Sequence, residues 1–485
     1  MHTNRCYTAD RMNLMDQNHR LVHLDLKGAP PRVEYLEQVI PLFKKLGATG
    51  LLIEYEDMFP YYGDLEEVAS QHAYSKEAIY RIQQLAEENS LIIIPLVQSF
   101  GHFEFVLKHE KFRSLREVPN YPMALCPSNP DSLMAVCMMI DQVMELHQGL
   151  RWFHIGADEV YHIGICDKCK KRMHVQNLTQ QQLFFSHCKA VLNYIKVKYP
   201  SVTAIMWDDM LRHTELPVLL ESGLAGLVEP MVWHYLTKFL LPPDIWDKFS
   251  KLFPNIWFGS AFKGATGSNM YLTNIGYHIE NHLVWVALQE KEKQKFQTIR
   301  GYAVTGWSRY DHYAVLCELL PQALPSLGIC LSVLNKGTFN ADLHNGVSAV
   351  LKFKSHLPIS PFQCLGAPPC DFPGHKVYRD MLDFNHLEAS YEDLMHNESI
   401  FTWMNEYQIK RNFVNPVHVG PLLNAVAKLL ESFRILKARL QSSLSEVFYD
   451  TATEEWMNVY FFPKKHKLKD IIENARNSGL SSLIE

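Results

Sequence analysis

Two adjacent carboxylates, Asp158 and Glu159, are the residues of this sequence best suited to acid–base chemistry. They follow an alternating bulky run that starts at Trp152, and Gly156 and Ala157 stand directly before them. This pattern predicts a buried strand that presents both acids at its C-terminal end. Because like charges disfavour each other's ionised form, such a pair can keep one carboxyl protonated beside an ionised neighbour. The alternative is a helix N-terminus, where the dipole alone favours acids.

Short apolar runs that alternate with helix-like segments must position these acids. Eight such runs lie between residues 21 and 307, at 21–26, 50–55, 91–97, 152–158, 202–207, 224–229, 255–260 and 301–307. Eight β/α units of this length predict a (β/α)8 TIM-type barrel, whose strands are apolar on both faces. The alternative is a doubly wound open sheet, but no Gly-rich phosphate motif follows the first strand.

Acids and tryptophans gather at the ends of these runs. In a barrel, all eight strand ends meet at one mouth, where active sites are found. Carboxylates bind hydroxyl groups and indole rings cover the apolar face of a sugar, so this mixture favours a carbohydrate over a phosphorylated ligand. The residues concerned include Asp25, Lys27, Glu54, Asp158, Glu159, Trp207, Asp208, Glu229, Trp233, Trp307 and Asp311.

The segment HIGADEV at residues 154–160 resembles the catalytic motif of glycoside hydrolase family 20, the β-N-acetylhexosaminidases. Because further similar motifs lie on several predicted strands, a chance match is disfavoured. These motifs are at 21–30, 52–60, 106–109, 207–211, 261–267 and 305–313.

The resemblance implies an exo-acting, retaining reaction in which the substrate itself supplies the nucleophile. The 2-acetamido oxygen of a terminal N-acetylhexosamine would attack its own anomeric carbon. Glu159 would protonate the leaving oxygen and later deprotonate water. Asp158 would hold the acetamido N–H and stabilise the positive oxazolinium-type intermediate. No cofactor is implied.

The resemblance also assigns residues that would bind the sugar. His102 would support Asp158, and either Tyr310 or Tyr235 would bond to the acetamido oxygen. Lys27 stands where the family usually has an Arg that binds sugar hydroxyls. The remaining expected substrate-binding residues are Asp25, Glu229 and Asp311 for hydroxyl groups, and Trp207, Trp233 and Trp307 as aromatic walls.

Two departures from the family pattern point to one branch of it. Lys27 has a single ammonium group where Arg would have a planar guanidinium that can form two parallel hydrogen bonds, so hydroxyl recognition is expected to differ. The small α+β domain that precedes the barrel in lysosomal and bacterial relatives is expected to be missing, because the first strand begins near Leu21. Both features are similar to a branch that prefers N-acetylgalactosaminides over N-acetylglucosaminides and occurs in the cytoplasm and nucleus.

Composition argues against two classes of partner. The formal charge is −5 and the basic residues are scattered, which gives no case for nucleic acid or an anionic membrane surface. The polar first ten residues lack a secretory signal, and no apolar run of about 18 residues would span a bilayer. The ten cysteines form no dense framework, so we expect reduced thiols and a cytoplasmic and nuclear location.

One further motif could bind a metal. Cys166 and Cys169 form a Cys-x2-Cys pair between His162 and His174, and such a set can hold zinc tetrahedrally. No second Cys-x2-Cys follows, so unliganded thiols in a surface loop are favoured. A catalytic metal is not expected, because the implied mechanism has no step that needs one.

The chain divides into four predicted parts. They are a flexible N-terminal segment over 1–19, the catalytic barrel over 20–340, an extended Pro-rich connection over 341–374 and a helical region over 375–485. An amphipathic stripe over 416–447 is expected to pack on the barrel or on itself. Packing on a second subunit, which would give a homodimer, is the alternative.

Two other functions stay open at this point. A carbohydrate-binding pseudoenzyme would keep the pocket without turnover, although the intact acids argue against it. A glycosidase with a protein nucleophile such as Glu54 or Asp208 would also cleave sugars that lack an acetamido group.

Overall fold

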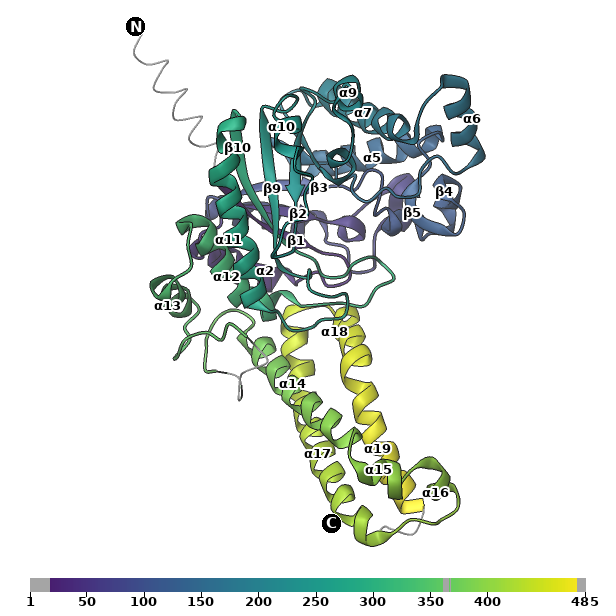
Figure 1. Cartoon of the computed structure of the whole chain (residues 1–485), viewed down its shortest axis with the longest axis vertical. Helices are drawn as coiled ribbons and strands as arrows, with labels where there is room; N and C mark the ends of the chain where they lie inside the picture. Colours follow the sequence, from purple (N-terminus) through teal and green to yellow (C-terminus); the bar gives the residue numbers. More distant parts are fainter. Residues whose placement is uncertain (1–17, 361–365, 367, 478–485) are drawn as a thin grey trace.

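The computed structural model describes residues 18–360, 366 and 368–477. Eight parallel strands form a closed barrel in the order β1-β10-β9-β8-β7-β6-β3-β2, which confirms the predicted (β/α)8 fold (Figure 1). The barrel strands are β1 (His19–Asp25), β2 (Gly50–Glu54), β3 (Ile92–Leu96), β6 (Trp152–His154), β7 (Thr203–Trp207), β8 (Val228–Trp233), β9 (Asn255–Lys263) and β10 (Thr298–Gly306).

Helices surround the barrel and bury the outward-facing side of its strands, which is why the strands are apolar on both faces. The barrel interior holds a separate cluster that includes Leu21, Leu52, Trp152 and Trp257. The helices of this part are α2 (Val33–Lys45), α3 (Lys76–Glu88), α4 (Glu104–Leu107), α5 (Pro130–Leu146), α6 (Asp167–Gln176), α7 (Gln180–Lys198), α8 (Asp209–Arg212), α9 (Leu216–Glu221), α10 (Ile245–Phe249), α11 (Ile275–Glu292) and α12 (Leu320–Lys336).

Three elements differ from the sequence expectation. The sixth strand, β8, starts four residues later than the run at 224–229, because Leu224 and Leu227 form a hydrogen-bonded turn. A two-stranded hairpin of β4 (Arg116–Val118) and β5 (Tyr121–Leu125) extends the loop after β3. Helix α13 (Ala341–Val350) occupies the start of the stretch expected to be extended.

The C-terminal helices form an elongated unit below the barrel (Figure 1). Helix α17 packs against α14 and α19, so its buried stripe lies inside this unit. None of the described helices is both long and apolar enough to cross a membrane. The helices are α14 (His375–Met395), α15 (Glu398–Trp403), α16 (Glu406–Lys410), α17 (Pro416–Val447), α18 (Asp450–Trp456) and α19 (Phe462–Asn477).

The C-terminal unit is joined to the loop that follows β1. The Arg32 N–H donates to the Val447 carbonyl at 2.7 Å, and Pro31 forms a β-bridge with Phe448. The C-terminal helices are therefore part of the same packed body as the barrel.

Candidate active site

A cavity of about 210 Å³ opens at the C-terminal ends of the barrel strands. Its position is that of the active site in barrels of this type. Most of the residues predicted from the sequence line it, namely Lys27, His102, Asp158, Glu159, Trp207, Trp233, Tyr235, Trp307 and Tyr310.

The loop after β6 presents the two acids through an unusual backbone. Gly156, Ala157 and Glu159 all have positive φ angles, at 61°, 69° and 51°. At the two non-glycine positions this conformation costs on the order of 1–3 kcal/mol each. A Cβ at Gly156 would lie 1.9 Å from the Gln98 amide oxygen, so only glycine fits there. Surrounding packing therefore holds Asp158 and Glu159 in one defined arrangement.

Asp158 is the more enclosed of the two acids, with its side chain 9% exposed. One of its carboxylate oxygens accepts a hydrogen bond from Gln98 Nε2 at 3.1 Å, and the other lies 3.5 Å from His102 Nε2. Burial raises the pKa of Asp158, and the charge of His102 opposes that shift. The charge of His102 therefore favours the ionised form of Asp158 against the effect of burial.

Glu159 lies further out, with its side chain 35% exposed, and shares His102 with Asp158. Its carboxylate lies 3.1 Å from His102 Nε2 and accepts the Tyr161 hydroxyl at 3.0 Å. The hydrogen bond with His102 lowers the pKa of Glu159. Burial lowers the pKa of His102, but the charge of Asp158 and the bond to Glu159 outweigh it and raise that pKa to about 10. With a pKa of about 10, His102 is protonated at neutral pH and lies between the two acids.

Lys27 is the buried cation of a second cluster at the mouth. Its ammonium lies 2.9 Å from Asp25 and 3.5 Å from Glu56, and 5.1 Å from the centre of the Trp307 ring. Burial lowers the pKa of Lys27, but the neighbouring acids raise it well above its usual value. Burial likewise raises the pKa of Glu54, but Lys27 and a bond with His23 hold it well below its usual range. Lys27 and Glu54 are consequently charged.

Tryptophans enclose the cavity on one side. The rings of Trp207 and Trp307 lie 6.2 Å apart, and Trp233 stacks on Tyr235 at 5.1 Å. The buried Trp207 Nε1 has no hydrogen-bond partner within the described part of the chain. A buried donor without a partner at the edge of a cavity is available to a ligand.

Three predicted residues lie outside the cavity lining. Glu229 is the second residue of β8, so it sits near the opposite end of the barrel, where it pairs with Arg300 at 2.7 Å. Asp311 accepts the N–H groups of Tyr313 and Ala314 and so closes a turn. Asp25 accepts the Ser308 N–H at 2.7 Å and holds Lys27.

Two other residues at the site, Gln98 and Arg309, stand at predicted strand ends, but the sequence assigned them no role. Gln98 donates both to Glu54 at 3.2 Å and to Asp158, and its position after the third strand was the available signal. Arg309 also lines the cavity, and it pairs with Glu455 of α18 at 2.6 Å. No local pattern could reveal that second contact, because 146 residues separate the partners.

The candidate metal motif is rearranged relative to the prediction. Cys166 and Cys169 group with Glu117 and Cys126, and their potential ligand atoms lie within 4.8 Å of one another. His162 instead packs on the ring of Tyr121 at 5.0 Å. His174 is an exposed residue in the last turn of α6.

Comparison with known proteins identifies a family for this chain. Residues 38–236, which include both acids, match the catalytic domain of glycosyl hydrolase family 20. The chain is 41% identical to Hexosaminidase D of Homo sapiens over 460 residues, covering 94% of each chain. It is 48% identical to Hexosaminidase D of Bos taurus over 339 residues, covering 69% of this chain and 97% of that protein.

Solved structures share the fold at low identity. A beta-N-acetylhexosaminidase from Bacteroides fragilis aligns with a TM-score of 0.51 at 17% identity, covering 69% of this chain and 70% of that one. A chitobiase from Flavobacterium johnsoniae aligns with a TM-score of 0.52 at 16% identity, covering 96% and 78%.

Proposed function

The chain belongs to glycosyl hydrolase family 20, and from that premise we propose that it is an exo-acting, retaining β-N-acetylhexosaminidase. Its substrate would be a glycoside with a terminal, non-reducing N-acetylhexosamine, with N-acetylgalactosamine preferred over N-acetylglucosamine. The similarity to Hexosaminidase D along nearly the whole chain supports this class of substrate. Lys27 in place of the usual Arg supports a distinct pattern of hydroxyl recognition. A cytoplasmic and nuclear location remains a prediction.

One observation carries the mechanism: two adjacent acids face one cavity from different environments. The more exposed Glu159 is suited to meet the leaving group, and the proton that it shares with His102 would be transferred to the glycosidic oxygen. As the bond to the anomeric carbon breaks, the 2-acetamido oxygen would attack that carbon and form an oxazolinium ion. Glu159 would then take a proton from the water that opens this intermediate.

The enclosed Asp158 is suited to the complementary task. An ionised carboxylate beside the acetamido group would accept its N–H and stabilise the positive charge that develops during the reaction. Gln98 and His102 orient Asp158 for this contact. The Trp207 and Trp307 rings would enclose the acetamido methyl and the sugar ring.

Hydrolysis of three aryl glycosides by the wild type and by Glu159→Gln tests the proposal. The substrates are a β-N-acetylgalactosaminide, a β-N-acetylglucosaminide and a plain β-galactoside. We expect turnover of the two acetamido sugars, fastest for the galacto form, and a loss of roughly 10²–10⁴-fold in the variant. Binding without cleavage would favour a pseudoenzyme. Equal cleavage of the plain galactoside would overturn the substrate-assisted mechanism and favour a protein nucleophile such as Glu54.

A further inference from the structure

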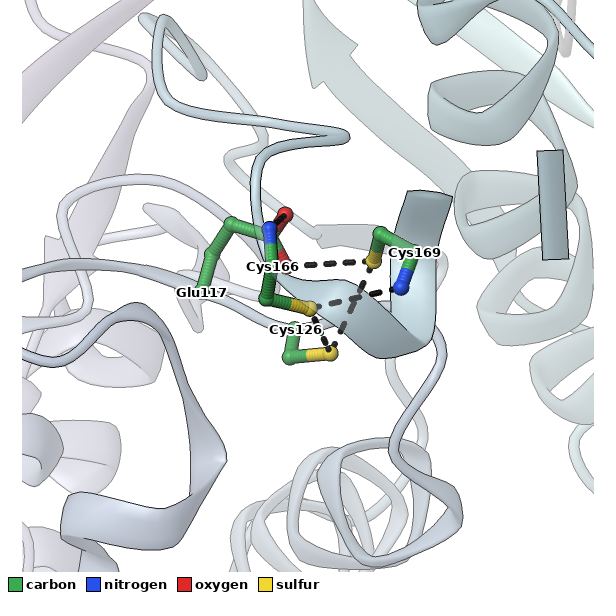
Figure 2. Close-up of side chains that lie close together, drawn as sticks. All are labelled: Glu117, Cys126, Cys166 and Cys169. Carbon is green, nitrogen blue, oxygen red and sulfur yellow. Dashed lines mark hydrogen bonds between the residues drawn. The ribbon is translucent and has the colours of Figure 1, made fainter. Parts of the chain in front are cut away.

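A compact group of three cysteines and one glutamate lies beside the active site, in a part of the molecule that the proposed chemistry does not use. Glu117 is in β4, Cys126 follows β5, Cys166 caps the N-terminus of α6 and Cys169 lies in its first turn (Figure 2). All four potential ligand atoms lie within 4.8 Å of one another. Segments about 40 residues apart in the chain thus converge on a single point.

The spacing of these atoms is close to that of a tetrahedral metal site. Cys126 Sγ lies 3.4 Å from Cys166 Sγ and 3.6 Å from Cys169 Sγ, and Cys169 Sγ lies 3.1 Å from a Glu117 carboxylate oxygen. A zinc ion with Zn–S bonds of about 2.3 Å holds two sulfur ligands roughly 3.8 Å apart. These three separations are within a few tenths of an ångström of those in such a site, and the remaining pairs of ligand atoms lie within 4.8 Å of one another.

Burial makes the group costly without a cation. Glu117 is 1% exposed, Cys169 0% and Cys126 2%. In the part of the chain that the structure describes, the hydrogen-bond partners of Glu117 are backbone N–H groups and a thiol, none of which is charged. A carboxylate that is buried without a positive partner is strongly disfavoured, and a divalent cation would compensate its charge.

The surrounding hydrogen bonds orient the four groups toward one centre. One oxygen of Glu117 accepts the N–H groups of Ile165 and Cys166 at 2.6 and 3.0 Å, so the other oxygen is the one that faces Cys169. Cys166 Sγ accepts the Cys169 N–H at 3.3 Å at the start of α6. These bonds fix the directions in which the ligand atoms of Glu117 and Cys166 point.

We propose that Glu117, Cys126, Cys166 and Cys169 bind one Zn²⁺ ion in a closed, tetrahedral, structural site. Three thiolates and one carboxylate fill all four positions, so no place is left for a reacting water. The set of ligands differs from the one expected from the sequence, because Glu117 and Cys126 replace the two histidines. The binding proposal does not rest on the proposed hydrolase activity.

The position of the ion also gives it a consequence for the active site. The β4–β5 hairpin is hydrogen-bonded to the loop that carries His102, through Leu125 to Phe100 at 3.2 Å and Phe103 to Met123 at 3.0 Å. Cys166 ends the loop that carries Glu159. An ion that joins the hairpin to α6 would therefore fix the distance between His102 and Glu159.

The metal content of the purified full-length protein tests the proposal directly. We expect about one zinc per chain by elemental mass spectrometry. After exchange with Co²⁺ we expect the visible d–d bands of tetrahedral coordination and near-ultraviolet charge-transfer bands from the thiolates. Cys126→Ser and Cys169→Ser should lose the metal, and Glu117→Gln should weaken binding by at least about tenfold. Cys137→Ser, at a half-buried cysteine on α5, and His174→Ala should both retain it.

Several outcomes would overturn the proposal. They are a folded wild-type protein without zinc, a Cys126–Cys166 disulfide in the non-reduced protein, or full zinc content in Cys126→Ser. If the ligand variants do not fold, the wild type decides: a chelator should expose Cys126, Cys166 and Cys169 together to alkylation, and reactivity that is independent of the chelator would contradict the site. These readouts need no substrate, so the hydrolase proposal can fail without affecting them.

Discussion

The two ends of the barrel both bury a carboxylate beside tryptophans, but they satisfy it in different ways. At the N-terminal end, Glu229 pairs with Arg300 at 2.7 Å and accepts the Trp257 Nε1–H at 2.8 Å. At the mouth, Asp158 and Glu159 share the single cation His102 and face a cavity. The residue types are alike, and the difference lies in how completely each charge is matched.

This difference separates a structural acid from a functional one. A carboxylate with its own arginine and an indole donor has little interaction left to offer a ligand. Acids that compete for one proton next to open space have shifted pKa values and can respond to a substrate. Substitutions at the mouth should therefore lower activity and spare stability. Substitutions at the N-terminal end should lower stability and spare activity.

The largest effect is expected from removing the charge of the enclosed acid. Asp158→Asn keeps the size of the side chain but removes the negative charge that would stabilise the intermediate, so kcat should fall about 10²–10³-fold. The melting temperature should not decrease, because a buried charge has been removed. Steady-state kinetics on an aryl β-N-acetylgalactosaminide measure this, and a loss of less than about threefold would contradict the role of Asp158.

At the opposite end, Glu229→Gln should act on stability instead. The variant replaces the charged partner of the half-buried Arg300 guanidinium by a neutral amide, and we expect the free energy of unfolding to fall by about 2 kcal/mol. Activity per folded molecule should stay unchanged, as measured by chemical denaturation and by kcat. The double variant Glu229→Gln/Arg300→Met should recover part of the loss. A large fall in kcat with normal stability would place Glu229 in the substrate site.

A pH profile tests the shared proton at the mouth. Below about pH 10 the His102–Glu159 pair holds a proton, and above that value the proton is lost, so the alkaline limb of kcat/KM should lie near pH 10. In His102→Gln the proton is left to the two carboxyl groups, and the pKa of Glu159 is no longer lowered by His102. The alkaline limb should then move down toward the ordinary range of a glutamic acid, about pH 4–5. An unmoved limb would show that His102 does not store the proton.

The smallest effect is expected where the C-terminal unit meets the mouth. Glu455→Gln weakens the pairing with Arg309, whose side chain is 11% exposed and lines the cavity. KM should rise about two- to threefold with little change in kcat, since a partly exposed pair contributes less than about 1 kcal/mol. The neighbouring exposed Glu454→Gln is the matched control and should leave KM unchanged.

The fold could be predicted wherever a strand is a continuous apolar run. The run at 224–229 misled because Leu224 and Leu227 make a turn, while the true strand contains Pro230, a residue that normally argues against a central strand. That displacement also moved Glu229 from the expected mouth to the other end. An error of four residues in the start of this strand thus placed Glu229 at the wrong end of the barrel.

The sequence predicted that the two acids lie at the mouth of the barrel, but it did not predict the residues that support them. Asp158 and Glu159 are recognisable because they follow a strand and match a family motif. Gln98, Glu117 and Glu455 act through partners that lie far away in the sequence. Periodicity and local motifs describe one element at a time, so contacts of this kind appear only when the elements are assembled.

The bond between Arg32 and Val447 has a consequence for the synthesis of the protein. It closes the loop after β1, five residues beyond Lys27, with a segment that is synthesised only after all the barrel strands. Barrel strands can begin to associate on the emerging chain, but this seam must wait for α17. We therefore expect the nascent protein to acquire its finished pocket late, so that a chain whose translation stops before α17 contains Asp158 and Glu159 without a completed enzyme.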